Sequence, residues 1–265
     1  MKNKIAIAIP LTLITPMIAE SSEIRLSGHR AVYELSFDSA KPNSGVVGAE
    51  GRYVFDLDDA CVGFALNERL VVKIARTEDN VLTDYRLSAF ESSDGSEYRF
   101  STSTDFNGRT GQKADGDLSV NLKAETADVD YEKAEDLAFE HPVLAPVAHI
   151  RAVIEAASAG EERHAAMIFD GDVDNPTYYA ATRISKVSDD KIIKGTKELA
   201  ELNRWKIDSV YFPPETGGEG DSATPAFSFS ATIFENGVVA DLRLDYDEFA
   251  LNATLSDLEI RESGC

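Results

Sequence analysis

Two cysteines are the residues whose chemistry the sequence defines most clearly. Cys61 lies early in the chain and Cys265 is its last residue. An N-terminal export signal, described below, directs the chain to a compartment where thiols oxidise to disulfides. In the chain-entropy view, a disulfide that closes a loop of about 200 residues stabilises a fold by roughly 5 kcal/mol. We therefore predict a Cys61–Cys265 disulfide, with two unpaired thiols as the alternative.

One acidic segment has the beginning of a cation-binding pattern. Asp170-Gly171-Asp172-Val173-Asp174-Asn175 places carboxylates at alternate positions. An EF-hand loop needs glycine at its sixth position and glutamate at its twelfth. The chain has Asn175 and Ala181 there, so the pattern fails. A solvated turn is favoured and a looser cation site is the alternative. Asp115-Gly116-Asp117 is interpreted in the same way, and no metal ligand is predicted.

The histidines do not form a recognisable metal or catalytic set. His29, His141, His149 and His164 show no zinc-binding spacing, and no cysteine is near them in sequence. We expect His149 to be a packed, hydrogen-bonded core residue beside the apolar stripe of a helix. We expect His29 to open the first strand and make structural polar contacts.

Other catalytic patterns are absent from the sequence. No Gly-x-Ser-x-Gly nucleophile motif occurs. Asp245 and Asp247 are expected on one strand face, but 47 acidic residues produce such pairs by chance. Gly45-Val46-Val47-Gly48 precedes a strand and not a helix, so it predicts a turn and no phosphate-binding loop. The sequence therefore predicts no catalytic residue, no cofactor-binding residue and no enzyme.

Alternation of apolar and polar residues dominates the chain and predicts strands. In the strongest C-terminal pair, Asn236-Gly237 is expected to form a two-residue hairpin turn. The alternating segments are His29–Asp38, Gly51–Asp58, Leu66–Ile74, Val81–Ala89, Tyr98–Thr104, Leu118–Leu122, Tyr178–Ile184, Trp205–Tyr211, Phe227–Ile233, Leu242–Tyr246 and Leu251–Leu255.

One segment has helical spacing instead. Leu144, Val147, Ile150, Ile154 and Ala157 recur on one helical face, Pro146 suits the first turn and Gly160 suits the C-terminal cap. A weaker pattern predicts a second short helix around Lys197–Glu201. Two segments, Asp105–Asp117 and Pro213–Ser222, are expected to be mobile loops. The fold class is thus mainly β, a large antiparallel sheet system with one central helix.

The N-terminus has the layout of a secretory signal peptide. Lys2 and Lys4 precede a short apolar run from Ile5 to Ile14, and a break ending at Ala19 leads into polar sequence. The run is shorter than the roughly 20 apolar residues of a membrane span, and no later segment is long and apolar enough. We expect residues 1–19 to be a signal peptide and residues 20–265 to be a single β-rich domain. A buried N-terminal element is the alternative.

Composition limits the possible partners. With 26 basic and 47 acidic residues the formal charge is −21, which disfavours binding to nucleic acid and to anionic lipid surfaces. A hydrophobic fraction of 43% is enough for a full core. Neither a protein partner nor an oligomeric state is specified by the sequence.

An ordered set of motifs runs through the chain. It comprises His29-Arg30-Ala31-Val32-Tyr33, Ser44-Gly45-Val46-Val47-Gly48-Ala49-Glu50-Gly51-Arg52, Cys61-Val62-Gly63-Phe64, Thr83-Asp84-Tyr85-Arg86, Tyr98-Arg99-Phe100-Ser101, Phe169-Asp170-Gly171, Phe234-Glu235-Asn236-Gly237 and Asp241-Leu242-x-Leu244-Asp245-Tyr246-x-x-Phe249, with the closing Cys265. Together these motifs, from about His29 to Cys265, resemble the EipB-type cell-envelope integrity family. Its members are periplasmic proteins of Gram-negative bacteria that were long described as a domain of unknown function.

The resemblance implies a periplasmic location and a curved or spiral β-sheet similar to that of periplasmic lipoprotein carriers. It also implies a disulfide between the positions of Cys61 and Cys265, a role in envelope stability, and no catalytic residues. We therefore expect a non-enzymatic protein that supports envelope integrity by binding or scaffolding, with envelope proteins or an apolar ligand as partner.

Two other functions are weighed beside it. The first alternative is a carrier that holds a lipid or acyl chain in the concave face of the sheet. Phe227-x-Phe229 and Tyr98-x-Phe100 would line that face, although core packing is their favoured use. A hydrolase acting on an envelope polymer is the less favoured alternative.

Overall fold

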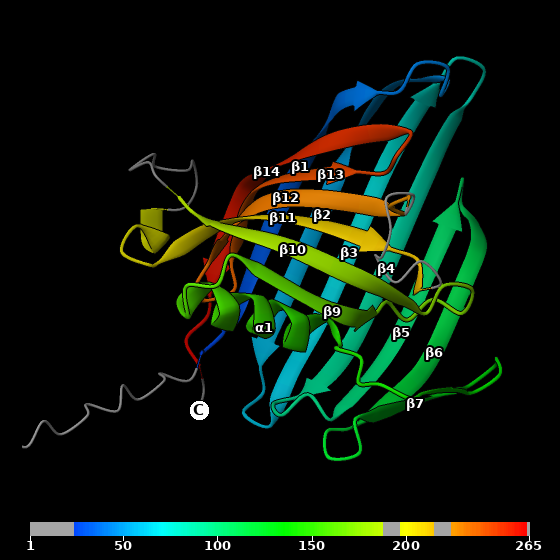
Figure 1. The fold of residues 1–265 in the computed structure, drawn as a ribbon. Helices are drawn as coiled ribbons and strands as arrows, with labels where there is room; N and C mark the ends of the chain where they lie inside the picture. Colours follow the sequence, from blue (N-terminus) through cyan, green and yellow to red (C-terminus); the bar gives the residue numbers. More distant parts are fainter. Residues whose placement is uncertain (1–23, 188–196, 215–223, 264–265) are drawn as a thin grey trace, which may run out of the picture.

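A computed structural model describes residues 24–187, 197–214 and 224–263 of the chain. Its single α-helix is α1 (Pro146–Ser158), and Lys197–Leu199 form a 3-10 turn where a short helix is predicted. The predicted signal peptide, residues 215–222 of the second predicted loop and Cys265 lie outside the described residues. The strands are β1 (His29–Ala40), β2 (Val46–Asp59), β3 (Gly63–Arg76), β4 (Asn80–Ser92), β5 (Glu97–Phe106), β6 (Arg109–Asn121), β7 (Thr126–Tyr131), β8 (Leu137–Phe139), β9 (Arg163–Phe169), β10 (Thr177–Lys186), β11 (Arg204–Phe212), β12 (Phe227–Phe234), β13 (Val239–Asp245) and β14 (Phe249–Ile260) (Figure 1).

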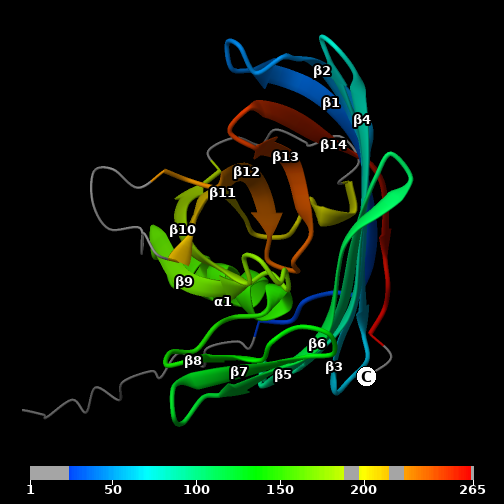
Figure 2. The same ribbon diagram turned by 90° about the vertical axis from the view of Figure 1, so that its right-hand side faces the viewer.

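All these strands belong to one sheet of 14 strands, in the order β8-β7-β6-β5-β4-β3-β2-β1-β14-β13-β12-β11-β10-β9. Each neighbouring pair is antiparallel, and β1 joins the two meanders by pairing with β14 as well as with β2. The sheet curls so that β9–β13 and α1 lie inside the curve of β1–β7 (Figure 2). The predicted fold class, an antiparallel curved sheet with one helix, is confirmed.

The alternation seen in the sequence becomes the two faces of this sheet. Tyr33 pairs with Tyr53, Tyr53 with Leu70, and Leu70 with Tyr85, which forms one inward row across four strands. The residues beside this row, such as Arg52 and Arg69, point outward and form ion pairs with carboxylates. Side chains on successive positions of a strand face opposite sides, so the register fixes which residues meet inside.

The helix lies where the predicted pattern places it. Pro146 occupies its first turn, and Gly160 beyond its C-terminus has a φ of +82°, which a glycine adopts without strain. Leu144 is not helical: it forms a parallel bridge with Ile168 of β9. The helix therefore begins after the bridge and runs back along β9.

The segment Asp105–Asp117 is not a loop, so that prediction is wrong. It contains the end of β5, a turn and most of β6. Asn107 and Gly108 have φ values of +51° and +75°, as a tight hairpin turn requires. Both faces of this hairpin are solvated near its tip, so its residues are hydrophilic on both sides. The alternation of polar and apolar residues that predicts a strand is therefore absent there. For the same reason Asp115-Gly116-Asp117 is strand rather than a solvated turn.

Other strand limits also differ from the prediction. Strand β2 begins at Val46, so only Gly45, with a φ of +75°, belongs to the predicted glycine turn. The hairpin at Asn236-Gly237 is confirmed, but four residues and not two connect β12 to β13, and only Gly237 of the pair has a positive φ, +90°. Strands β7, β8 and β9 were not predicted. Strand β8 has only three residues, whereas β7 does alternate, with Ala127, Val129 and Tyr131 buried, and was overlooked.

Candidate ligand-binding cavity

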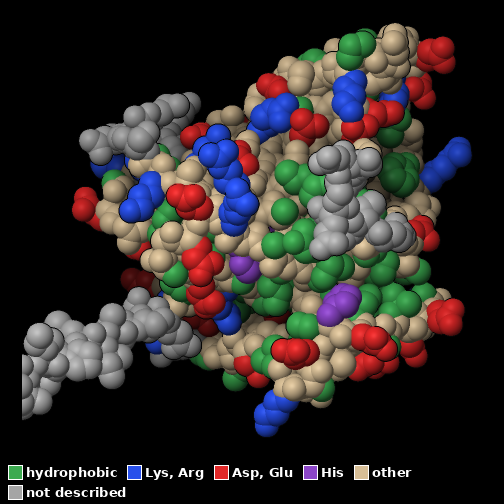
Figure 3. All heavy atoms as spheres, in the orientation of Figure 1, with side chains coloured by type: hydrophobic (Ala, Val, Ile, Leu, Met, Phe, Trp, Pro, Cys, Tyr) green, Lys and Arg blue, Asp and Glu red, His purple; other side chains and the backbone are tan. Residues whose placement is uncertain are grey.

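A cavity of about 490 Å³ lies between the inward faces of β1–β5 and the opposing wall formed by α1 and β11–β13. Its volume falls within the range of about 300–1,000 Å³ that is usual for small-molecule sites. In the space-filling view apolar side chains gather in the middle of one face, with charged side chains around them (Figure 3). The aromatic rings that line the cavity are those of Tyr33, Tyr53, Phe55, Tyr85, Tyr98, Phe169, Tyr211, Phe227, Phe229 and Tyr246.

Contacts between distant strands hold the two walls in place. The Tyr33 hydroxyl of β1 donates a hydrogen bond of 2.7 Å to the carbonyl of Val239 on β13. The ring of Tyr33 stacks on that of Tyr53 at 5.6 Å between centroids. On the other wall, Tyr211 stacks on Phe227 at 4.4 Å. These contacts fix the aromatic lining on both sides of the space.

Glu68 of β3 is the most unusual residue in the lining. Its inward position lies between Leu66 and Leu70 in an otherwise apolar row. The Tyr53 hydroxyl donates a hydrogen bond of 3.0 Å to its Oε2 atom. Burial, opposed by this hydrogen bond and assisted by Asp170, raises the pKa of Glu68 to about 7. A carboxyl group that titrates near neutrality is therefore placed inside the cavity.

Asp170 lies on the opposing side, directly after β9, where it lines both this cavity and a smaller one of about 340 Å³. Burial and the neighbouring Asp172 raise the pKa of Asp170 to about 6. Asp170 has an exposed side chain, as the predicted solvated turn requires, and it also lines both cavities. Among the described residues, no group of three or more acidic, histidine or cysteine side chains is arranged to hold a metal ion.

His149 on α1 also lines the cavity, and its ring meets the Tyr211 ring edge-on at 6.3 Å. Burial, with a smaller contribution from His164, lowers the pKa of His149 to about 4, so the ring is neutral at physiological pH. Its predicted burial is confirmed. The predicted hydrogen bond is not found at Nε2, which has no partner among the described residues.

His29 opens β1 and makes a polar contact, as predicted, and its side chain is buried. Its Nδ1 donates to the Ser27 carbonyl at 2.8 Å and its ring stacks on Phe55 at 5.3 Å. The ring lines the cavity, and burial lowers its pKa. His29 therefore supplies neutral polar surface to the site.

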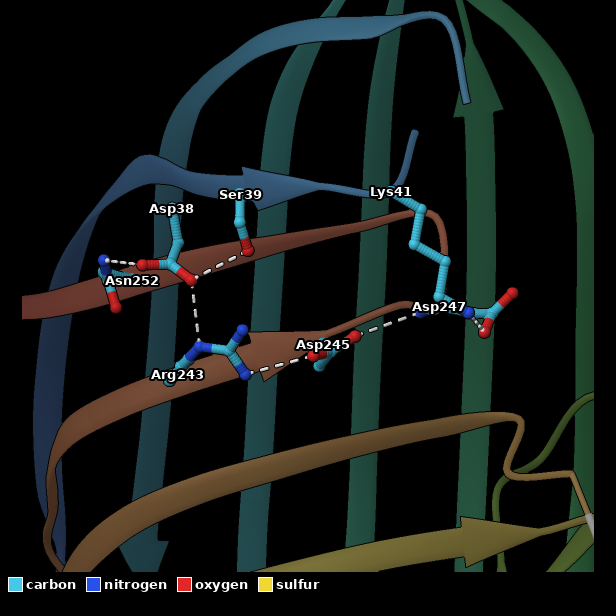
Figure 4. Close-up of polar contacts among 7 residues, drawn as sticks. All are labelled: Asp38, Ser39, Lys41, Arg243, Asp245, Asp247 and Asn252. Carbon is cyan, nitrogen blue, oxygen red and sulfur yellow. Dashed lines mark hydrogen bonds and ion pairs between the residues drawn. The ribbon is translucent and has the colours of Figure 1, made fainter. Parts of the chain in front are cut away.

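The acidic pair Asp245 and Asp247 belongs to a cluster on the rim of the sheet. Figure 4 shows Arg243 between Asp38 and Asp245, which accept hydrogen bonds of 3.0 and 3.1 Å from its guanidinium. Asp247 has a φ of +66°, lies in the turn after β13 and forms an ion pair with Lys41. The expectation that both carboxylates share one strand face is wrong, and the cluster ties β1 to the β13–β14 hairpin.

The neighbourhood of Cys61 is described, whereas Cys265 lies outside the described residues. Cys61 is in the turn between β2 and β3, where its backbone N–H donates to Asp59 Oδ1 at 3.0 Å. Ser263 Oγ donates to the other oxygen of Asp59 at 2.8 Å. The segment that leads to Cys265 thus runs beside the turn that holds Cys61, and the disulfide stays a prediction.

The aromatic motifs proposed for the concave face are mostly found there. Phe227, Phe229 and Tyr98 line the cavity. Phe100 instead packs between Phe169 and Tyr131, at 5.1 and 5.9 Å between ring centroids. Three of these four rings therefore line the cavity, and one packs in the core. The sequence had favoured core packing for all four.

Glu68 was missed by sequence reasoning, although its signal is present. The alternating series Leu66, Leu70, Val72 and Ile74 contains one inward position occupied by a carboxylate. A charged residue inside an apolar series marks either an interruption of the strand or a polar group inside the fold. The strand continues through Glu68, so the second explanation holds.

The sequence model of the family described as EipB-like matches residues 20–262. The chain belongs to the EipB-like family. Within this family it is 27% identical over 253 residues to the cell envelope integrity protein EipB of Brucella abortus (strain 2308), covering 92% of this chain and 88% of EipB.

A solved structure agrees with the EipB-like assignment. The crystal structure of a β-barrel-like protein of the domain of unknown function DUF1849 from Brucella abortus superposes with a TM-score of 0.79. It is 25% identical in sequence, and the match covers 90% of this chain and all of the crystallised chain. The family predicted from the sequence is therefore confirmed, and the curled sheet is the EipB-like fold. Among the described residues, no helix has the length and apolar character needed to cross a membrane.

Proposed function

We propose that this EipB-like protein is a non-enzymatic periplasmic protein that supports the cell envelope by holding an apolar or amphiphilic ligand inside its curled sheet. The export signal at residues 1–19 and the cell envelope integrity protein EipB as a relative support the location and the process. The cavity supports the binding role, which includes the lipid or acyl carrier considered from the sequence.

The observation that carries the proposal is the cavity lining. Aromatic and aliphatic side chains from both halves of the sheet line a space of about 490 Å³ that none of them fills. Protein interiors are ordinarily packed to about the density of organic crystals, so an apolar space of this size is costly unless it serves binding. The protein gains function from this space at the expense of stability.

Binding is tested with a neutral fluorescent probe, N-phenyl-1-naphthylamine, whose emission rises in apolar surroundings. The wild-type protein should enhance its emission saturably. Leu70→Trp places an indole in the cavity and should remove most of this enhancement. Lys73→Trp adds the same indole to the outward face of β3 and should leave it unchanged. Equal enhancement by both variants would show that the probe binds elsewhere.

A genetic experiment links the cavity to the envelope. A deletion strain is complemented with the wild type, Leu70→Trp or Lys73→Trp, and sensitivity to detergent and to wall-targeting antibiotics is measured. We expect Lys73→Trp to restore resistance and Leu70→Trp to fail at equal protein level. Full rescue by Leu70→Trp would favour scaffolding by the outer surface over ligand binding.

A further inference from the structure

The charged side chains that line the cavity are both acidic. Glu68 projects from β3 and Asp170 from the end of β9, and the described lining contains no lysine or arginine. Neither carboxylate forms an ion pair with any described residue. Desolvation and the charge of Asp170 raise the pKa of Glu68 to about 7. Desolvation and the charge of Asp172 raise the pKa of Asp170 to about 6, although the Asp170 side chain is exposed to solvent.

The two histidines of the lining do not supply the missing positive charge. Burial lowers the pKa of both His29 and His149, so both rings are neutral at pH 7. Arg261, which acts on His29 from a distance, is bound to Asp56 and Asp58 instead. An anionic head group in the larger cavity would therefore meet two carboxylates and no cationic side chain of its lining. Lys113 and Lys133 line only the smaller, adjoining cavity.

Aromatic rings surround the acidic groups. Tyr53 contacts Glu68 directly through its hydroxyl, and Tyr33 stacks on Tyr53. Tyr85 lies where the two cavities meet, and its pKa is raised mainly by burial and further by the charges of Glu68 and Asp170. The faces of aromatic rings attract organic ammonium groups, and the attraction is stronger when the ammonium is desolvated.

We propose that the cavity is selective for amphiphiles with an ammonium head group, which lies among Glu68, Asp170 and Tyr85 while the alkyl chain contacts the apolar wall. The inference rests on the proposed binding function. It adds the chemical class of the ligand: a cationic amphiphile in preference to a free fatty acid or another anionic amphiphile.

The test is competition against N-phenyl-1-naphthylamine by three dodecyl amphiphiles below their micellar concentrations. These are dodecyltrimethylammonium, neutral dodecyl maltoside and anionic dodecyl sulfate. At pH 8 we expect the cation to displace the probe at a concentration at least about tenfold lower than the anion. Isothermal titration should give the same order.

Two variants locate the head group. Glu68→Gln and Asp170→Asn remove one negative charge each with little change of shape, and each should weaken binding of the cation severalfold more than binding of dodecyl maltoside. Circular dichroism checks that each variant is folded, and the two positions are far apart in the chain, so misfolding of one leaves the other informative.

The outcomes separate this inference from the proposed function. Equal competition by anion and cation, or an equal loss of cationic and neutral binding in the variants, overturns the ammonium selectivity while probe binding still supports the binding role. A wild-type protein that binds neither the probe nor any of the three amphiphiles overturns both proposals.

Discussion

Glu91 and Val147 connect β4 to the first turn of α1: Glu91 Oε2 accepts a hydrogen bond of 2.8 Å from the Val147 backbone N–H. Its Oε1 accepts a second, of 2.6 Å, from Ala148. The exposed backbone N–H groups at a helix start need such acceptors, and the helix dipole favours a negative charge there. One carboxylate thus fixes the helix that closes the gap between the two ends of the curled sheet.

Replacing Glu91 should therefore destabilise the fold. In Glu91→Gln the amide nitrogen cannot accept a hydrogen bond, so one buried N–H loses its partner, at a cost of about 1–3 kcal/mol in the free energy of unfolding. Urea denaturation measures this loss. Glu97→Gln, on the exposed side of β5, is the control and should change stability by less than about 0.5 kcal/mol. Equal effects of the two changes would contradict the helix-anchoring role.

Glu68 should make stability depend on pH. Its pKa of about 7 in the folded protein lies above the unfolded value of about 4.3, so between these values the native state holds the proton more tightly. Its contribution to the free energy of unfolding is present below the unfolded pKa and is lost as the pH rises through about 7. The Glu68→Gln variant has no titrating group at this position, so its free energy of unfolding does not fall in this way as the pH rises.

The difference in unfolding free energy between Glu68→Gln and the wild type should therefore shift in favour of the variant from pH 5 to pH 8. The expected shift is on the order of 2 kcal/mol. Denaturation at several pH values measures it. Lowered histidine pKa values, as at His149, act in the opposite direction, but they are common to both proteins and cancel in this difference. A difference that does not change with pH would refute the raised pKa.

Gly51 and Gly48 on β2 offer a matched test of how closely strands approach. A Cβ atom at Gly51 would lie 2.1 Å from the Val71 carbonyl oxygen, whereas one at Gly48 would meet only the Ala75 side chain at 3.9 Å. Gly51→Ala should lower stability by about 1–3 kcal/mol through overpacking. Gly48→Ala should be neutral or up to about 1 kcal/mol more stable, because it restricts the unfolded chain. Thermal denaturation should separate the two, and similar melting temperatures would contradict the close approach.

The Cys61–Cys265 disulfide remains a prediction, supported by the Ser263–Asp59 hydrogen bond beside the Cys61 turn. Cys61→Ser and Cys265→Ser should each lower the free energy of unfolding by about 2–5 kcal/mol. The double variant should be no worse than either single variant, and reductant should affect only the wild type. Intact mass spectrometry should show oxidised wild-type protein. Additive losses in the double variant would show that the two thiols are not partners.

The sequence by itself determined much of the local structure. Alternation along segments such as His29–Asp38 and Phe227–Ile233 predicted strands, since a sheet with one buried face requires that period. The helical stripe ending before Gly160 predicted α1 for the corresponding reason. The ordered motifs also identified the family. The pattern failed where both faces of a hairpin are polar, as at β5–β6, because no contrast in hydropathy remains there.

Only the tertiary structure decided which inward faces meet and how far apart they stay. Tyr98 and Phe100 show the same alternation, yet Tyr98 lines the cavity and Phe100 packs against Phe169. A filled core and an open cavity bury the same kinds of side chain, so hydropathy cannot distinguish them. The curl of the sheet sets the distance between its walls, and that distance brings Glu68 and Asp170, remote in sequence, into one cavity.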